Sequence, residues 1–215
     1  MKRRAVVLHS GGLDSTVCVL LARSKGIDVL SLGIDYGQRH RIELEYARLQ
    51  CERLDVERKV IRLEWDKPRR EMPTKRTVKE IRRSVSSAFL PGRNAIFLAV
   101  ACAEAAGREA DEVWIGVNAV DFSGYPDCKP RFIQSFREMQ RCAVPEGPKV
   151  CAPLLHLTKP QIARLARKHG LQRGDVWCCY RPTLAPGGVK PCGVCDACVL
   201  HEYAWSEGSK GAVKS

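Results

Sequence analysis

The sequence predicts an α/β protein built on a doubly wound, mostly parallel sheet. Short apolar runs alternate with stretches of helical spacing along most of the 215 residues. The apolar run 4–9 leads through a polar turn into a second apolar stretch at 16–22, as a buried strand leads into a helix. Alternation of this kind places helices on both faces of a parallel sheet. The length suffices for one sizeable core and a small appendage.

The first third of the chain supplies three expected strands and two helices. Residues 4–9 form a compact apolar run typical of a buried strand, and residues 15–24 continue as a helix. The run 29–36 is again apolar and predicts a second strand. Residues 41–53 mix Ile, Leu and Tyr with Glu and Arg, which favours a helix, and residues 56–65 predict a third strand.

The remaining elements repeat the same alternation. The last expected helix has the clearest limits, because Thr158 can cap it, Pro160 lies in its first turn and Gly170 ends it. The pattern predicts an Ala-rich buried helix at 94–106, a strand at 112–117, a helix at 130–142, a strand at 150–155 and a helix at 158–169.

Composition indicates a cytoplasmic protein. The chain is 45% hydrophobic and 28% charged, as soluble globular proteins are. No apolar stretch is long enough to span a membrane, and the basic start lacks the apolar region and cleavage site of a signal peptide. Eleven cysteines, several of them within apolar segments, favour buried thiols in a reducing compartment over a disulfide framework.

The turn Ser10-Gly11-Gly12-Leu13-Asp14-Ser15 predicts a phosphate-binding loop. Glycines let the backbone approach an anion, the serines add hydroxyl donors, and the helix start adds free N–H groups and a positive dipole. No GK[ST] triplet or GxGxxG pattern is present. The loop instead resembles the pyrophosphate loop of enzymes that split ATP between the α- and β-phosphates. The alternative is an ordinary turn in which Asp14 caps the helix.

Cysteines near the C-terminus predict a structural zinc site. Cys192, Cys195 and Cys198 follow a Cys-x2-Cys-x2-Cys spacing, and a closed tetrahedral site needs a fourth thiolate. Cys179 is the expected donor across a Pro/Gly-rich loop, and Cys178 is the alternative. An iron–sulfur cluster, a redox pair and unliganded buried cysteines are the competing interpretations.

A net charge of +12 raises the possibility of a nucleic-acid-binding protein. The densest cluster, 67–83, holds eight Lys or Arg against Glu71 and Glu80 and has no aromatic residue for base stacking. We expect this segment to be a mobile loop near the ATP site. A basic proteome, or a positive field that attracts ATP and a carboxylate substrate, is the alternative explanation of the charge.

Five blocks of sequence together resemble the QueC family of 7-cyano-7-deazaguanine synthases, from about residue 4 to residue 203. The loop after the first strand alone would fit many ATP pyrophosphatases, whereas the combination of all the blocks fits far fewer proteins. The blocks that carry the resemblance, besides the loop, are Tyr36–His40 with Glu43-Leu44, Leu90–Asn94 with Phe97-Leu98, Gly116–Cys128, Pro153-Leu154 with Leu157–Lys159, and Cys179-Tyr180 with Cys192–Cys198.

The resemblance implies a fold of the adenine nucleotide alpha hydrolase-like (PP-loop) type and a ligase reaction. Such enzymes activate 7-carboxy-7-deazaguanine with ATP and Mg²⁺, add ammonia to give the amide, then activate and dehydrate the amide to the nitrile. It further implies an ATP-binding α/β domain at 1–170, a four-cysteine zinc segment at 171–206 packed on it, and a flexible tail at 207–215. We also expect a homodimer with no stable nucleic-acid partner.

Site residues follow from the matched blocks. Asp14 is expected to hold Mg²⁺ or to orient the loop, and Arg93 and Asn94 are expected to bind phosphate or the substrate carboxylate. Asp121 or Asp127 is expected to read the donor edge of the deazaguanine, and Tyr125 to stack on its ring. The expected catalytic residues are Asp14, Ser15, Arg93 and Asn94; the ATP-binding residues are His9, Ser10, Gly11, Gly12, Leu13, Asp14, Ser15, Thr16 and Arg39; the substrate-binding residues are Gln38, His40, Asn118, Asp121, Ser123, Tyr125 and Asp127.

The sequence departs from the family pattern between Trp65 and Phe89, where the segment is short and basic. Three alternatives therefore stay open: a tRNA-modifying enzyme of the same loop class, such as a thiolase; a family paralogue serving DNA modification or defence; and a zinc-stabilised nucleic-acid-binding module that consumes no ATP.

Overall fold

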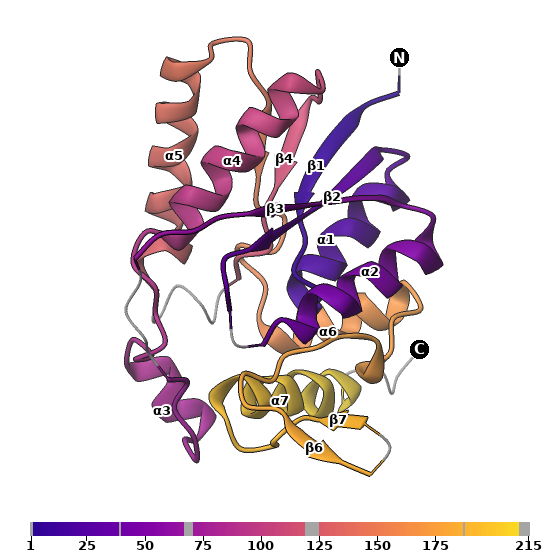
Figure 1. The fold of residues 1–215 in the computed structure, drawn as a ribbon, viewed down its shortest axis with the longest axis vertical. Coiled ribbons are helices and arrows are strands. Elements are labelled where there is room, and N and C mark those ends of the chain that lie inside the picture. Colours follow the sequence, from indigo (N-terminus) through magenta and orange to yellow (C-terminus); the bar gives the residue numbers. More distant parts are fainter. Residues whose placement is uncertain (1, 39, 67–70, 119–124, 187, 211–215) are drawn as a thin grey trace.

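A computed structural model describes residues 2–38, 40–66, 71–118, 125–186 and 188–210. Its centre is a sheet of five parallel strands in the order β3-β2-β1-β4-β5 (Figure 1). Val6 of β1 lies opposite Leu30 on one side and Val113 on the other. The strands are β1 (Arg4–Leu8), β2 (Asp28–Asp35), β3 (Glu57–Arg62), β4 (Glu112–Trp114) and β5 (Lys149–Cys151). The predicted doubly wound parallel sheet is confirmed.

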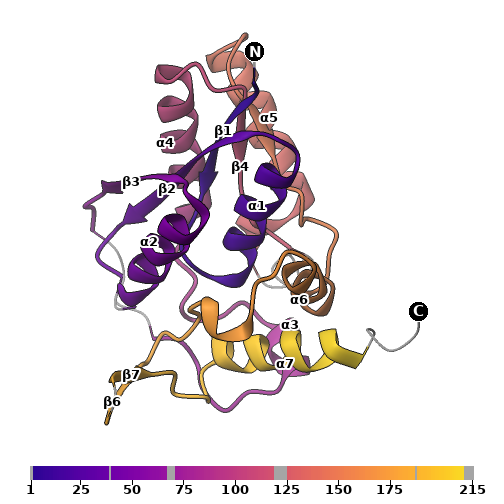
Figure 2. The ribbon, with the colours of Figure 1, turned by 90° about the vertical axis from the view of Figure 1, so that its right-hand side faces the viewer.

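Helices cover both faces of the sheet (Figures 1 and 2). Alternate residues of β1 face opposite sides, so Val7 joins a core with α1 and α6, and Val6 joins a core with α4 and α5. Because both faces are buried, β1 is apolar without alternation. The helices are α1 (Leu13–Ser24), α2 (Ile42–Leu54), α3 (Val78–Arg83), α4 (Arg93–Gly107), α5 (Pro130–Ala143), α6 (Lys159–Lys168) and α7 (Asp196–Lys210).

The strand order reverses between β1 and β4. From β1 the chain proceeds outward to β2 and β3, whereas β4 lies on the other side of β1 and continues to β5. Loops leaving two adjacent strands thus diverge at this point and leave room for a ligand at the carboxyl edge. Gly116 after β4 packs on the start of α1, where an added Cβ would lie 3.0 Å from the carbonyl carbon of Asp14.

Several details differ from the sequence expectation. The strand expected at 150–155 ends at Cys151, since Pro153 has no N–H to continue the ladder. The basic segment expected as a loop contains the short helix α3, which a Thr77–Glu80 capping box starts. A hairpin of β6 (Thr183–Ala185) and β7 (Gly188–Lys190) was not predicted.

The first residues of the predicted flexible tail at 207–215 belong to helix α7. Helix α7 continues to Lys210 because its apolar side packs on α6. Gly208 permits a close approach there, since a Cβ would lie 3.0 Å from the carbonyl oxygen of Pro160. Residues 211–215 lie outside the described part of the chain. None of the helices within the described residues is long and apolar enough to cross a bilayer.

Candidate active site

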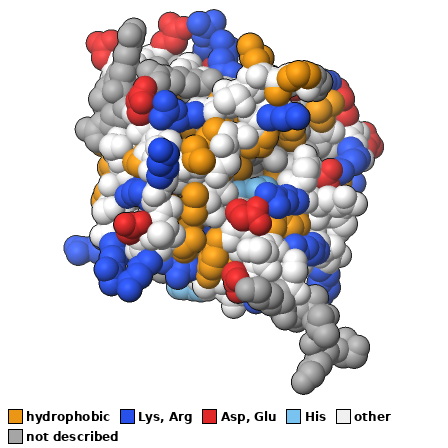
Figure 3. All heavy atoms as spheres, turned by 90° about the horizontal axis from the view of Figure 1, so that it is seen from below, with side chains coloured by type: hydrophobic (Ala, Val, Ile, Leu, Met, Phe, Trp, Pro, Cys, Tyr) orange, Lys and Arg blue, Asp and Glu red, His pale blue; other side chains and the backbone are white. Residues whose placement is uncertain are grey.

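A cavity of about 350 Å³ opens at the carboxyl edge of the sheet, at the point where the strand order reverses. The loop after β1, the start of α4 and one side of α7 contribute to its wall. Seen from below, where α7 and α3 lie, hydrophobic side chains gather in the middle of the face, and Lys and Arg side chains are interspersed with acidic ones (Figure 3).

The loop from Ser10 to Ser15 enters the cavity as the start of α1. The Ser15 hydroxyl donates to the Gly12 carbonyl at 3.1 Å and lies 3.2 Å from the Ser10 hydroxyl. Ser10, Gly12, Leu13, Asp14 and Ser15 line the cavity, so the first turn of α1 presents its N–H groups there. This arrangement is compatible with the predicted anion cradle.

Gly11 lies close against helix α2. Its φ is +91°, and an added Cβ would lie 2.2 Å from the carbonyl oxygen of Glu43 and 2.8 Å from the Ala47 nitrogen. Its missing side chain thus faces helix α2, and Gly11 is not among the residues that line the cavity. Gly11 lets the loop pack on α2, whereas Gly12 has an ordinary φ of −81° and lines the cavity.

A buried amide, Gln50 of α2, holds this loop on the side facing the protein interior, and no pattern in the sequence predicted this contact. Its oxygen accepts from the His9 ring at 2.8 Å and from the Thr16 hydroxyl at 3.0 Å. Its nitrogen donates to the carbonyls of Gly11 and Asp175. With every donor and acceptor of the amide engaged, the loop is fixed before any ligand arrives.

His9 and Thr16 therefore face the protein interior through their side chains. His9 Nδ1 lies 2.8 Å from the Ser31 hydroxyl, and its imidazole is only 1% exposed. Burial lowers the pKa of His9 to about 3, and the nearby Arg58 guanidinium acts in the same direction. A neutral His9 positions the loop and is not a cation for phosphate.

Asp14 connects three distant segments. One of its oxygens, Oδ2, accepts from the Asn118 amide at 2.7 Å and forms an ion pair with Lys159 at the start of α6. The other oxygen, Oδ1, is buried and has no hydrogen-bond partner among the described residues. Carboxylate oxygens are the ligands Mg²⁺ prefers, so Oδ1 fits the expected metal. Lys159 belonged to a matched block, which was the available signal, but no role was predicted for it.

A second group of cavity residues surrounds Arg93. Its guanidinium donates to the Tyr36 hydroxyl at 3.4 Å and lies beside the Tyr180 side chain. Burial raises the pKa of Tyr180 to about 12, so its hydroxyl stays protonated at neutral pH. The ring of His40 lies on Tyr180, with ring centroids 3.8 Å apart, and His40 Nε2 contacts Glu43 at 3.3 Å. Arg93 is thus a fixed cation bordered by aromatic side chains.

Other predicted residues have structural partners. The Asp127 carboxylate accepts from the Asn94 N–H at 3.2 Å and so caps α4, and the Asn94 side-chain amide also donates to the Asp127 carbonyl at 3.1 Å. Gln38 bonds within its own loop, accepting from Tyr36 N at 2.9 Å. Neither Gln38 nor Asp127 lines the cavity, whereas Asn94 does.

Tyr125 also lines the cavity and stacks on Phe89, with centroids 5.4 Å apart. This places a flat aromatic surface at the wall, as the expected stacking on a purine-like ring requires. Three predicted site residues, Arg39, Asp121 and Ser123, lie outside the described residues.

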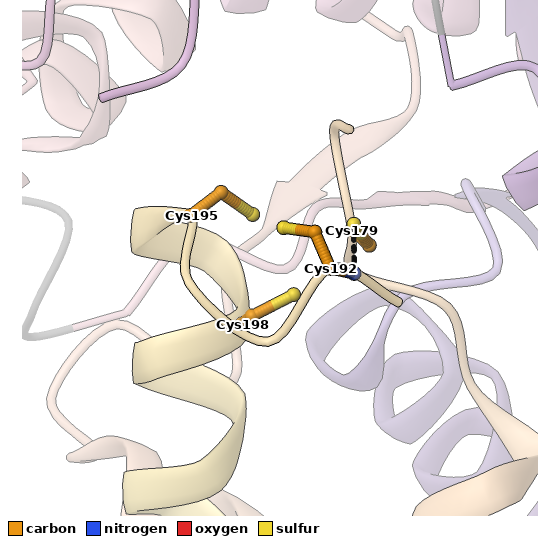
Figure 4. A group of neighbouring side chains, drawn as sticks. All are labelled: Cys179, Cys192, Cys195 and Cys198. Carbon is orange, nitrogen blue, oxygen red and sulfur yellow. Dashed lines mark hydrogen bonds between the residues drawn. The ribbon is translucent and has the colours of Figure 1, made fainter. Parts of the chain in front are cut away.

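Four cysteines gather below the sheet. The Sγ atoms of Cys179, Cys192, Cys195 and Cys198 all lie within 4.8 Å of one another (Figure 4). Tetrahedral zinc–thiolate bonds of about 2.3 Å require sulfur atoms about 3.8 Å apart, so a small contraction would close the site. Cys179 Sγ also accepts from the backbone N–H of Cys192 at 3.2 Å, as metal-bound thiolates commonly do.

The structure thereby distinguishes the two candidates for the fourth ligand. Cys179 belongs to the group, whereas Cys178 lines the cavity instead. The group could hold a metal ion, and four thiolates would leave it no open position for catalysis.

Comparison with known proteins gives consistent matches. The model of the family described as "Queuosine biosynthesis protein QueC" matches residues 4–209. "7-cyano-7-deazaguanine synthase 2" of Rhodopseudomonas palustris is 54% identical, covering 96% of this chain and 98% of that protein. "7-cyano-7-deazaguanine synthase" of Novosphingobium aromaticivorans is 45% identical, covering 94% and 90% of the two chains.

Solved structures share the fold at low sequence identity. The U34-tRNA thiolase NcsA from Methanococcus maripaludis matches with a TM-score of 0.53 and 18% identity, over 80% of this chain and 58% of that one. NMN synthetase from Francisella tularensis matches with a TM-score of 0.50 and 15% identity, over 81% and 63%. These likenesses support the PP-loop type of α/β fold.

Proposed function

This chain belongs to the QueC family of queuosine biosynthesis proteins, and we propose that it uses ATP to convert 7-carboxy-7-deazaguanine and ammonia into 7-cyano-7-deazaguanine. One observation supports this reaction above the others: a phosphate-binding loop and an aromatic wall with a fixed arginine open into the same cavity. A ligase that activates an aromatic acid with ATP needs both within reach of one another.

The phosphate-binding loop and the start of α1 would promote activation of the substrate carboxylate by ATP. A carboxylate reacts poorly with ammonia because hydroxide is a poor leaving group, and transfer of AMP to its oxygen supplies a better one. Helix α1 would hold the departing pyrophosphate through its N–H groups and the hydroxyls of Ser10 and Ser15. Lys159 adds a positive charge beside Asp14. With Mg²⁺ bound, Asp14 would supply its ligand oxygen and Asn118 would hold the carboxylate in place.

The aromatic side would bind the acid. Arg93 is placed to hold the substrate carboxylate, and the Tyr36 hydroxyl and the Tyr180 side chain keep its guanidinium oriented. Tyr125 offers a face for the deazaguanine ring. Asp121 stays a candidate for the ring's donor edge, because Asp127 is engaged as a helix cap. We assign the same activated-carbonyl chemistry to the second, amide-dehydrating half of the reaction.

Zinc is the metal we propose for the four cysteines, with a structural role. Their thiolate set favours zinc over Mg²⁺, and a closed four-sulfur site offers no position for substrate. We further propose that the enzyme is a cytoplasmic homodimer that acts on small molecules without a stable nucleic-acid partner.

Product analysis tests the proposal. The zinc-loaded protein is incubated with ATP, Mg²⁺, ammonia and the acid, and mass spectrometry follows the nitrile while chromatography separates AMP from ADP. Nitrile and AMP are expected. Asp14→Asn should lower the rate about 10²–10³-fold. Asp28→Asn, at the amino end of β2 away from the cavity, is the matched control and should keep the wild-type rate.

Two results would redirect the assignment. Turnover only in the presence of tRNA would indicate a tRNA-modifying enzyme, and turnover only on a different deazapurine acid would indicate a specialised paralogue. Salt-dependent RNA binding without ATP consumption would indicate a nucleic-acid-binding module.

A further inference from the structure

Residues 71–86, part of the basic segment and the turn that follows it, form one wall of the cavity. Met72, Ile81, Ser84 and Ser86 all line it. The proposed reaction assigns no role to this segment. Its position at the cavity nevertheless means that its conformation sets the shape of the substrate site.

The segment is attached to the four-cysteine group through its backbone. Lys75 N donates to the carbonyl of Val194 at 2.8 Å, and Asp196 N donates to the carbonyl of Pro73 at 3.0 Å. Thr74 pairs with Cys195 as an isolated antiparallel bridge. These bonds reach the residues on both sides of Cys195, so the segment is held to the loop that would wrap the metal.

An ion pair adds a second link at the same place. The guanidinium of Arg76 forms a two-pronged contact with the Asp196 carboxylate, with Nε 3.1 Å from Oδ1. The Asp196 side chain is 4% exposed and that of Arg76 is 20% exposed, so both are shielded from water. Arg76 also donates to the Ser84 hydroxyl at 2.8 Å. Arg76 thus connects Asp196, which follows the expected metal ligand Cys195, with Ser84 of the cavity wall.

The segment has few other attachments. Helix α3 buries none of its residues, and its described contact outside the segment is with α7, where Arg82 donates to the Tyr203 hydroxyl at 3.3 Å and lies over its ring. Met72 contributes a buried side chain, and it packs in the small cluster that contains Cys179, Cys195 and Cys198. Its ordering therefore depends on contacts with the cysteine loop and with helix α7, which carries Cys198, because little apolar surface of its own is buried.

We propose that metal binding at the four cysteines orders the cavity wall at 71–86, and that the Arg76–Asp196 pair is the link between the two. A bound metal closes the Cys192–Cys198 loop and fixes the backbone groups to which residues 73–76 bond. The structural metal would then shape the substrate site without contacting the substrate. Arg76 is a positioning residue in this arrangement.

Hydrogen exchange followed by mass spectrometry tests the link in the full-length, zinc-loaded protein. Arg76→Gln should keep about one zinc per chain. Amide exchange within 71–86 should accelerate roughly ten- to a hundredfold, while β1 and β4 stay protected. Zinc removal from the wild-type protein by a chelator should accelerate exchange in the same segment. Lys79→Gln removes an equal charge from α3, where it is exposed, and should change nothing. Arg76→Lys keeps the charge but not the two-pronged contact and should restore part of the protection.

Wild-type protection at 71–86 after zinc removal, or in Arg76→Gln, would overturn the proposal. Loss of protection throughout β1 and β4 would also contradict it, since the metal would then support the whole fold. A kinetic measurement rests on the proposed function: Arg76→Gln should raise KM for the acid severalfold with zinc retained. If even the wild-type protein forms no nitrile, the proposed function fails. The hydrogen-exchange result still tests whether metal binding orders residues 71–86.

Discussion

Lys159 in the first turn of α6 forms an ion pair with Asp14 in the first turn of α1, although 145 positions separate them in the chain. Both side chains are largely buried, at 14% and 16% exposure, and the same carboxylate oxygen accepts from Asn118. Three segments therefore converge on one carboxylate at the mouth of the phosphate-binding loop. In the proposed reaction, this contact would place a cation beside the leaving pyrophosphate.

Replacing Lys159 should affect turnover more than stability. Lys159→Met removes the positive charge beside Asp14, and we expect AMP formation to fall about 10²–10³-fold. Lys168→Met, at the exposed opposite end of the same helix, should retain full activity. Steady-state assays and thermal melts of both variants give the comparison. Equal rates for the two variants would remove Lys159 from the proposed mechanism.

Gln50 should prove important for ATP binding although it touches no ligand site directly. Gln50→Ala leaves the Gly11 carbonyl and the His9 ring short of partners, so we expect a loss of about 1–3 kcal/mol in the free energy of unfolding. KM for ATP should rise about tenfold, because the loop is no longer fixed in advance. Urea titration and kinetics measure both effects. Gln134→Ala on the exposed face of α5 is the control.

The two glycines of the loop should respond differently to alanine. Gly11→Ala forces a Cβ into the backbone of α2 at a positive φ, which should destabilise the protein by about 2–5 kcal/mol. Gly12→Ala meets its nearest atom at 3.4 Å with an ordinary φ, so its cost should be about 1 kcal/mol or less. Denaturant midpoints report the difference. A stable Gly11→Ala protein would contradict the close packing of the loop on α2.

Stability should decline with acidification between about pH 6.5 and pH 3 because of His9. The folded state holds this imidazole neutral with a pKa of about 3, whereas the unfolded chain protonates it near 6.5. Over that interval the unfolded state binds more protons, so the free energy of unfolding falls as pH falls, by at most about 1.4 kcal/mol per unit. His201, whose pKa burial lowers to about 4, contributes in the same direction.

A variant isolates the His9 contribution. His9→Gln should show a shallower dependence of unfolding free energy on pH over the same interval. Acid release of metal from the thiolates affects both proteins equally and cancels in the comparison. Parallel profiles for the two proteins would show that His9 is not buried in the neutral form.

Metal content should distinguish the adjacent cysteines. Cys179→Ser removes one of the four gathered thiols and should abolish stoichiometric zinc binding, whereas Cys178→Ser should keep about one zinc per chain. Elemental analysis of the purified variants decides between them. Iron with sulfide in place of zinc would contradict the proposed metal, and metal loss in Cys178→Ser alone would contradict the geometry.

Elements with strong local signals were predictable. Helix α6 begins after Thr158 as expected, with the capping box formed and Pro160 in the first turn. The strand at β1 and the turn into α1 follow from an apolar run and two glycines. Helix α3 was missed because its short stretch is dominated by charge and buries nothing. The end of α7 was missed because its apolar contacts with α6 override a polar sequence.

The candidate site was only partly predictable. Asp14, Ser15, Arg93 and Asn94 do line one cavity, as motif matching suggested. Asp127 is the instructive exception, since its carboxylate caps α4 rather than facing the cavity. Spacing in the sequence shows which polar residues follow a strand, but not which of them a neighbouring helix end will use.

By itself, the sequence determined the order of strands and helices, the phosphate-binding turn, the family and the set of cysteines, because each of these depends on residues close together in the chain. The tertiary structure decided which side chains from distant parts of the chain contact one another: Lys159 with Asp14, Arg76 with Asp196, and Cys179 rather than Cys178 with the other thiols. Such pairs depend on how whole helices and strands pack and on the direction in which each side chain then points. The spacing of residues in the sequence does not predict either of these.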